Sequence, residues 1–194
     1  MCARARERGI ATIVDGAHAP GHVPLDLRAL DVDYYTGNCH KWLCAPKGAA
    51  FLYVRRELQD AIAPLVAGWG YEDGGTFLSR HEDQGTRDPA AFLTVPTAIE
   101  WQREHDWDAV RDRCRALAAE IPARLGLEPL GTGLQMVAMR LPPGAPADLQ
   151  QRLYDDYRIE IPVSDDARLI RASIQGYNGP DDVDALKSAL EALL

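Results

Sequence analysis

Apolar and polar positions divide the chain into two stretches with different repeat patterns. In the first stretch, short runs rich in β-branched and aromatic residues predict strands, and a helical pattern at residues 24–30 lies between the first two runs. The predicted strands are residues 10–14, 33–37 and 49–54. Their apolar content predicts that the first strand is buried and that the third is buried on both faces.

Helical periodicity dominates the second stretch. Pro89 opens a predicted helix that Pro96 interrupts and that ends near His105. The next helix carries an apolar face made of Val110, Cys114, Leu117, Ile121 and Leu125. A strand, a helix, two strands and a helix follow at residues 134–141, 146–157, 159–161, 168–174 and 181–193. This order suits a small α+β domain.

Composition and charge argue against several classes of protein. The 194 residues include 21 Lys and Arg against 29 Asp and Glu, a formal net charge of −8, and no basic tract interleaves with aromatic residues. We therefore expect no nucleic-acid partner. No apolar run reaches the length of a membrane span and no signal-peptide core follows the N-terminus, so we expect a cytoplasmic protein with no membrane partner. The cysteines and histidines lack metal-binding spacing, and no metal is expected.

Asp15 and Lys41 are the first candidates for chemistry. Asp15 ends the first predicted strand, and ligands of open α/β sheets bind at the carboxyl ends of strands. Lys41 follows His40 on a short loop, where a desolvated lysine can serve as a Schiff-base amine. An aspartate such as Asp15 can keep the pyridine nitrogen of pyridoxal phosphate protonated. The alternative is a surface lysine and an acidic residue at an ordinary turn.

The segments DGAHAPGHVPLDL and NCHKWLCAPKGAAFLYV resemble the cofactor segment of class V aminotransferase-type pyridoxal-phosphate enzymes, in particular the isopenicillin N epimerase-like branch. The resemblance implies that Lys41 binds the cofactor pyridoxal 5'-phosphate covalently and that Asp15 pairs with its pyridine nitrogen. His18 would lie beside the ring or its phenolic oxygen, and His40 would contribute to the phosphate site. Ordinary loop histidines are the alternative for both.

The glycine-rich, irregular region at residues 55–88 contains the segment HEDQGTRD. A Gly-Thr pair offers a backbone amide and a hydroxyl group to an anion, and Arg87 adds a positive charge. The resemblance implies that Gly85 and Thr86 reach the cofactor phosphate of the neighbouring subunit, and hence that the protein is a homodimer. A plain polar turn before a helix is the alternative.

The segment LIRASIQGYN resembles the C-terminal strand of class V enzymes. The resemblance implies that Arg171 binds the α-carboxylate of an amino-acid-like small-molecule substrate, with the planar, bidentate geometry of a guanidinium group. Arg168 is a second candidate for this carboxylate site. The alternative for Arg171 is an exposed strand arginine with no role in binding. We expect Tyr177 and Asn178 to shape the turn into the last helix.

The fold implied by the resemblance is α/β, the pyridoxal-phosphate-dependent transferase-like fold of the aspartate aminotransferase type. Residues 1–89 would form the later part of the large cofactor-binding domain, and residues 90–194 a connector helix and the small α+β C-terminal domain. No phosphate-binding loop motif precedes these segments. We therefore expect a C-terminal portion, from a truncated gene product, a mis-called start or a split protein. Such a chain would be poorly soluble or would bind a complementary N-terminal half.

The implied activity is chemistry at the α-carbon of an amino acid. Epimerisation is the leading prediction, a carbon–sulfur lyase reaction uses the same chemistry, and transamination is third. The segment at residues 161–168 holds no cysteine, which argues against a persulfide route, and Cys39 and Cys44 are expected to be small buried thiols. A non-catalytic remnant remains an alternative from another class. A lysine enzyme without cofactor is disfavoured by Asp15.

Overall fold

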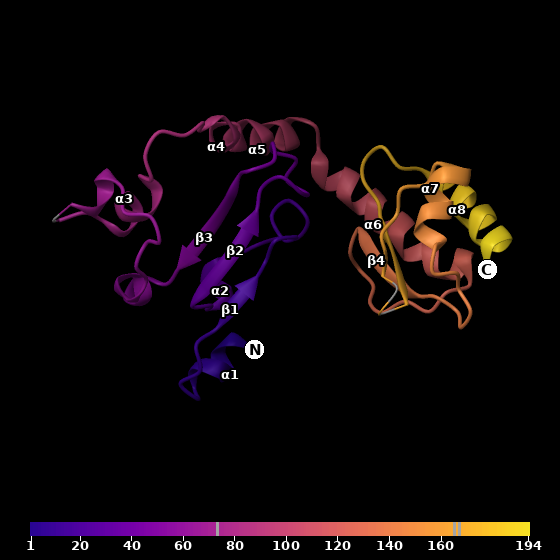
Figure 1. Cartoon of the computed structure of the whole chain (residues 1–194), viewed down its shortest axis with the longest axis horizontal. Helices are drawn as coiled ribbons and strands as arrows, with labels where there is room; N and C mark the ends of the chain where they lie inside the picture. The colour runs from indigo at the N-terminus through magenta and orange to yellow at the C-terminus, as the bar shows by residue number, and fades with distance from the viewer. Residues whose placement is uncertain (73, 165, 167) are drawn as a thin grey trace. The chain divides into compact units, whose positions relative to one another are not determined.

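The computed structural model describes residues 1–72, 74–164, 166 and 168–194, and these residues contain a three-stranded sheet in each half of the sequence (Figure 1). The chain divides into two units, Met1–Arg103 and Glu104–Leu194, and each unit contains one of the sheets. Within the described part of the chain, no helix is both long enough and apolar enough to cross a membrane.

The first sheet has the strand order β1-β2-β3. Strand β1 (Ile13–Asp15) runs parallel to β2 (Tyr34–Asn38), with Asp15 opposite Thr36, and β3 (Ala50–Val54) is antiparallel to β2. The parallel pair is joined through the short helix α2 (Leu27–Leu30), so the predicted strand, helix and strand order is confirmed. Because β1 and β2 are parallel, their carboxyl ends lie at one edge of the sheet.

The predicted burial of the first and third strands is wrong. Ile13 in β1 is 78% exposed and Leu52 in β3 is 48% exposed. Strand β1 lies at the edge of its sheet, and β3 alternates between partly buried and exposed positions, with Phe51 and Tyr53 on the covered face. The apolar content of both runs correctly predicted strands. The burial of each residue depends instead on the elements that pack against it.

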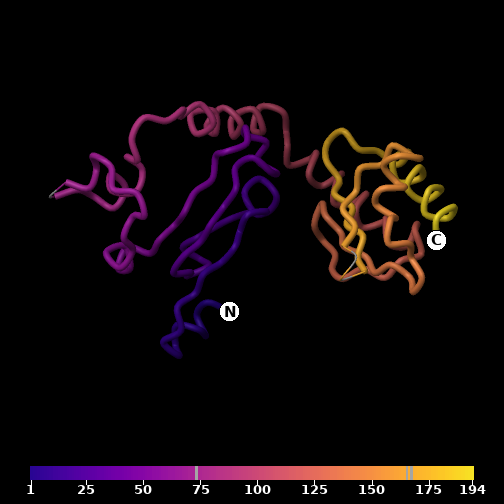
Figure 2. The backbone as a smooth tube through the Cα atoms, in the orientation of Figure 1, coloured from indigo at the N-terminus to yellow at the C-terminus, as the bar shows by residue number. Residues whose placement is uncertain are grey.

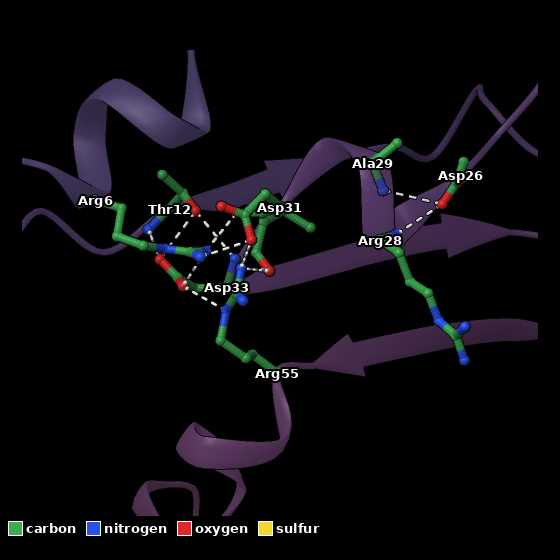
Figure 3. Close-up of polar contacts among 9 residues, drawn as sticks. Arg6, Thr12, Asp26, Arg28, Ala29, Asp31, Asp33 and Arg55 are labelled. Carbon is green, nitrogen blue, oxygen red and sulfur yellow. Dashed lines mark hydrogen bonds and ion pairs between the residues drawn. The ribbon is translucent and has the colours of Figure 1, made fainter.

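Charged residues join the amino ends of β1 and β2 to the carboxyl end of β3 (Figure 3). The carboxylate of Asp33 accepts hydrogen bonds from Thr12 N at 2.9 Å, Thr12 Oγ1 at 3.0 Å and Arg55 Nε at 3.0 Å. Asp31 Oδ1 pairs with Arg6 Nη1 at 2.6 Å and with Arg55 Nη2 at 2.9 Å. The cluster joins α1 (Cys2–Arg6) to β1, β2 and the end of β3, at the sheet edge opposite Asp15.

The segment between β3 and residue 89 is irregular, as the glycines predicted. It contains two 3₁₀ turns, η1 (Arg56–Ala61) and η2 (Trp69–Tyr71), and the helix α3 (Phe77–Glu82). The tube in Figure 2 shows how little regular structure this segment contains. The first unit extends to Arg103 and so includes the helix that follows residue 89. The predicted domain boundary at residue 89 stays a prediction.

That helix is in two pieces, α4 (Ala90–Leu93) and α5 (Val95–Glu104). Val95 and Ala98 of α5 pack against the small buried residues Cys39, Ala45 and Ala49 of the first unit. Pro96 lies in the first turn of α5, where its missing N–H does not interrupt an intrahelical hydrogen bond. The predicted interruption of the helix is therefore a break between two helices.

The second unit is built on the antiparallel sheet β4-β6-β5. Its strands are β4 (Met136–Arg140), β5 (Val163–Ser164) and β6 (Leu169–Ser173), and its helices are α6 (Trp107–Leu125), α7 (Leu149–Tyr157) and α8 (Pro180–Leu193). Met139, Leu149 and Ile170 are fully buried in its core. The small α+β domain predicted from the order of the elements is confirmed.

The strand predicted at residues 159–161 is wrong. Arg158 takes a left-handed conformation (φ 60°) at the end of α7, and Ile159 N donates to Leu153 O at 2.9 Å. These residues therefore complete the end of the helix, and pairing with β6 begins only at Val163. The alternation of Ile159, Glu160 and Ile161 also fits a segment that packs on the core directly after a helix. This pattern alone therefore does not distinguish such a segment from a strand.

Candidate active site

Asp15 stands at the edge where the parallel strands end. Its Oδ1 accepts a hydrogen bond from Ala17 N at 2.9 Å, and Gly16 N donates to Thr36 O at 2.9 Å on the neighbouring strand. These two bonds fix the turn that follows β1. Among the described residues, Oδ2 of Asp15 has no hydrogen-bond partner, so one oxygen is available to a cationic N–H.

Lys41 is joined to this turn through a histidine. Lys41 Nζ lies 3.2 Å from His18 Nε2, and Trp42 Nε1 donates to His18 Nδ1 at 3.1 Å. Both ring nitrogens of His18 are therefore in contact with the loop after β2. The structure brings together Asp15, His18 and Lys41 through one turn and one loop at the carboxyl ends of two parallel strands.

A second layer of contacts holds Trp42. The His22 ring stacks on the indole with centroids 4.2 Å apart, and His22 is only 2% exposed. Gln102 of α5 donates from Nε2 to Trp42 O at 3.0 Å. Gly21 (φ +76°) lies so close to this loop that a Cβ atom there would be 2.6 Å from Leu43 N. Glycine is required at this turn for both reasons.

Tyr35 of β2 packs over the turn at Asp15. A Cβ atom on Gly16 would overlap the outer atoms of the Tyr35 ring, so any larger residue at this position would displace that ring. Burial, and then the negative charge of Asp15, raises the pKa of Tyr35. Asp15, Gly16 and Tyr35 line an open hollow of about 550 Å³ together with residues of the segment around α2.

The loop carrying Lys41 also holds His40 and two cysteines. His40 Nδ1 is buried and has no hydrogen-bond partner in the part of the chain that is described. Cys39 is buried as predicted, and burial raises the pKa of its thiol. The prediction that Cys44 is buried is wrong: Cys44 is exposed, and it takes a left-handed backbone conformation (φ 63°).

Gly85 and Thr86 lie in the exposed loop after α3. Gly85 takes a left-handed conformation (φ +97°), which suits a tight turn. Among the described residues no hydrogen bond joins either of them to Asp15 or Lys41. The guanidinium group of Arg87 donates to Glu82 O at 3.1 Å and lies 5.0 Å from the centre of the Phe92 ring. The predicted contact of Gly85 and Thr86 with a phosphate stays a prediction.

The two candidate arginines of the second unit have different surroundings. Arg168 donates from Nη2 to Pro142 O at 2.6 Å, so its guanidinium group serves the loop after β4. Arg171 lies on β6, and its Nε is buried without a hydrogen-bond partner among the described residues. Arg171 therefore retains a donor for an anion. Asn178 accepts from Gln175 N at 2.9 Å and shapes the turn before α8, as predicted, while Tyr177 is 86% exposed.

Three features of the first unit fit pyridoxal phosphate. Lys41 offers an amine, Asp15 offers a carboxylate oxygen for the pyridine N–H, and His40 offers a buried ring nitrogen that lacks a partner. The sequence predicted all three residues. It did not single out Trp42, His22, Gln102 or Tyr35. Trp42 and His22 lie within the two motif segments, Tyr35 lies on the strand between them, and Gln102 lies on α5.

An aspartate and a lysine after the ends of adjacent parallel strands, with a small antiparallel α+β unit after them, fit the pyridoxal-phosphate-dependent transferase-like fold of the aspartate aminotransferase type. The family model described as aminotransferase class-V matches residues 1–139, and the chain belongs to this family.

Curated and solved relatives agree with this assignment. The chain is 41% identical to an isopenicillin N epimerase of Amycolatopsis lactamdurans and 38% identical to one of Streptomyces clavuligerus, covering 100% of this chain and 55% of each relative. The crystal structure of the Escherichia coli cysteine desulfurase CsdA matches with a TM-score of 0.80 and 26% identity, over 99% of this chain and 54% of that chain. The chain thus spans about half the length of the relatives it matches.

Proposed function

We propose that this chain is the lysine-bearing portion of a pyridoxal-phosphate-dependent enzyme that acts at the α-carbon of an amino acid or a derivative of one. The observation that carries the proposal is the 3.2 Å contact of Lys41 Nζ with His18 Nε2, beside the strand that ends on Asp15. A surface lysine at an ordinary turn does not require a buried histidine and tryptophan behind it.

Each candidate residue has a role in this proposal. Lys41 would hold the cofactor and later remove and return the proton at the substrate α-carbon as general base and acid. Asp15 would accept a hydrogen bond from the pyridine nitrogen through Oδ2. His18 would lie beside the ring or its phenolic oxygen, and His40 would take part in the phosphate site. Pyridoxal phosphate, when bound, supplies an electron sink for the α-carbon.

Epimerisation is the first candidate reaction because the relatives at 41% and 38% identity are named isopenicillin N epimerases. A carbon–sulfur lyase reaction is the second candidate, supported by 30% identity over 97% of this chain to a probable L-cysteine desulfhydrase of Arabidopsis thaliana. Both reactions, and transamination after them, need the same proton transfer by Lys41.

Two further contacts complete the proposed enzyme. Arg171 would bind the substrate carboxylate through its guanidinium group, since its Nε has no partner among the described residues. Gly85 and Thr86 would reach the phosphate of a neighbouring subunit in a homodimer. Both residues are exposed, and among the described residues neither is hydrogen-bonded to Asp15. A complementary N-terminal half is the alternative partner.

The first experiment is covalent labelling of the purified chain. We add pyridoxal phosphate, record the absorbance spectrum, reduce with borohydride and map the labelled peptide. The lysines of this chain are Lys41, Lys47 and Lys187, and the exposed Lys47 lies on the same loop as Lys41. We expect the label on Lys41, its loss in Lys41→Ala and its retention in the matched control Lys47→Ala. Equal labelling of Lys41 and Lys47 would contradict the proposal.

The reaction is tested next with amino acids in deuterated water. Epimerisation predicts deuterium at the α-carbon with recovery of both stereoisomers, a lyase predicts release of a sulfur-containing fragment, and transamination predicts an oxo acid. Arg171→Gln should raise KM for the carboxylate-bearing substrate, while Arg168→Gln should leave KM unchanged. A larger increase in KM for Arg168→Gln than for Arg171→Gln would show that the proposed assignment of the carboxylate to Arg171 is wrong.

A further inference from the structure

We propose that Trp42 is a positioning residue that fixes the tautomer of His18, so that the proton of His18 Nε2 points at the amine of Lys41. This proposal rests on the proposed function, in which Lys41 holds the cofactor. The tautomer itself is a property of the chain, and it can be measured whether or not a cofactor binds.

The argument begins with the indole group. An indole N–H can only donate a hydrogen bond, so the ring nitrogen that faces it must carry a lone pair. Trp42 Nε1 faces His18 Nδ1 at 3.1 Å. While this bond exists, Nδ1 is unprotonated and His18 is a neutral imidazole. The single ring proton of a neutral imidazole with a bare Nδ1 sits on Nε2.

The direction of the second contact follows. His18 Nε2 lies 3.2 Å from Lys41 Nζ, and a protonated Nε2 can only donate across this contact. The lysine nitrogen must then supply a lone pair, which a neutral amine has and an ammonium group lacks. A neutral amine is also the form of lysine that attacks a carbonyl carbon. Through His18, the hydrogen bond from the indole of Trp42 thus favours the contact in which Lys41 Nζ accepts a hydrogen bond.

The indole is held by a stacked ring, and its backbone is held by a hydrogen bond. His22 stacks on it with centroids 4.2 Å apart and planes 20° from parallel, and its Nδ1 lies 3.2 Å from His18 O. Gln102 of α5 binds the carbonyl oxygen of Trp42 at 3.0 Å. Trp42 is 7% exposed. A ring held by stacking, burial and its own backbone cannot easily turn its N–H elsewhere, so the donor is preorganised for His18 Nδ1.

The first test is ¹⁵N NMR of the imidazole nitrogens in the full chain without cofactor. His18→Gln identifies the His18 signals among those of the five histidines. We expect an unprotonated Nδ1 and a protonated Nε2 for His18. A protonated Nδ1, or two nitrogens in fast exchange between tautomers, would overturn the proposal. This measurement needs no variant at Trp42, so it decides the matter even if substitutions there destabilise the chain.

The second test removes the indole donor. Trp42→Phe keeps a ring for His22 to stack on and deletes the N–H, and Trp69→Phe is the control because Trp69 is 78% exposed. We measure reductive methylation of Lys41 by formaldehyde, relative to Lys47, by mass spectrometry. Loss of one hydrogen bond should reduce the relative rate about threefold to tenfold and mix the His18 tautomers. An unchanged rate together with an unchanged tautomer would overturn the proposal.

A double-variant cycle tests the route through His18. In the His18→Gln background, Trp42→Phe should cause no further fall in the methylation of Lys41, because the group it acts through is gone. The same fall in both backgrounds would mean that Trp42 affects Lys41 by packing alone. If pyridoxal phosphate fails to label Lys41 while the NMR result stands, the proposed function is wrong and the tautomer assignment is right.

Discussion

At the residue scale, the candidate site depends on atoms that the turn after β1 leaves available. The backbone holds one oxygen of Asp15 through Ala17 N, while Oδ2 has no partner among the described residues. A carboxylate positioned in this way can accept from a pyridine N–H without first breaking a bond within the chain. The same turn presents His18 to Lys41, so the two sides of the site share one support.

Replacing Asp15 by Asn tests this support directly. The amide oxygen of Asn can still accept from Ala17 N, while its NH₂ group would face the pyridine nitrogen and the negative charge would be lost. A hydrogen bond between charged groups contributes about 1.5–3 kcal/mol, so we expect the affinity for pyridoxal phosphate to fall about tenfold or more. Absorbance titration measures it, with Asp60→Asn as the control, since the Asp60 side chain is 99% exposed. Equal affinity in both variants would refute the role of Asp15.

At the element scale, the position of the loop after β2 depends on backbone packing that no side chain can replace. Gly21 combines a left-handed conformation with a close approach to Leu43. The loop and the turn press against each other at this glycine, and the contact sets how near Trp42 comes to His18. Strand pairing alone would leave this spacing undetermined.

Gly21→Ala should therefore be more destabilising than Gly9→Ala. Both glycines have positive φ, but a Cβ atom at Gly9 would meet nothing within 4 Å, while one at Gly21 would meet Leu43 N at 2.6 Å. The left-handed conformation costs an alanine about 1–2 kcal/mol in either place, and the clash at Gly21 adds about 1–3 kcal/mol. Urea unfolding of the two variants measures the difference. Equal losses would show that the loop yields without strain.

The charged cluster at the opposite sheet edge predicts a second contrast. Asp33 is 8% exposed and accepts three hydrogen bonds from Thr12 and Arg55, whereas the Asp31 side chain is 40% exposed. Asp33→Asn should lower the free energy of unfolding by about 1.5–3 kcal/mol, and Asp31→Asn by about 1 kcal/mol or less. Asn also tolerates the left-handed conformation of Asp31 (φ 54°). Denaturant unfolding would contradict this ranking if the two variants lost the same stability.

At the scale of the whole molecule, the two units differ in their cores. The large buried cluster lies entirely in the second unit, between α6, α7, α8 and the sheet of β4 and β6. In the first unit the corresponding cluster consists of Cys39, Ala45 and Ala49 with partly buried neighbours, while Ile13 stays 78% exposed on its edge strand. Burial of apolar surface is the main stabilising term, so the second unit should be the more stable one.

Hydrogen exchange followed by mass spectrometry tests this asymmetry. We expect the amides of β6 to exchange more slowly than those of β1. Leu149→Ala removes a fully buried side chain of the second unit and should destabilise that unit by about 2–5 kcal/mol, leaving exchange in β1 and β2 unchanged. Equal protection of both sheets, or loss of protection in β1 in this variant, would mean that the two units unfold as one.

Much of this protein could be predicted from its sequence. Periodicity located most helices and most strands, since repeats of 3.6 and 2 residues reflect local geometry, but it missed α3 in the glycine-rich region. Asp15 and Lys41 could be proposed as site residues because each lies in a short motif of contiguous residues. The order of elements in the second unit followed from the same local signals, and its one wrong strand lies at a helix exit where local signals are ambiguous.

Only the tertiary structure decided what these residues touch. Trp42 and His18 are 24 positions apart, and their contact depends on the register of two strands and on the close approach at Gly21. The structure likewise separated Arg168, bound to Pro142 O, from Arg171, and it showed that β1 and β3 are not buried as their composition predicted. Local sequence determines the conformation of a segment, whereas burial and hydrogen-bond partners depend on which distant segments pack against it.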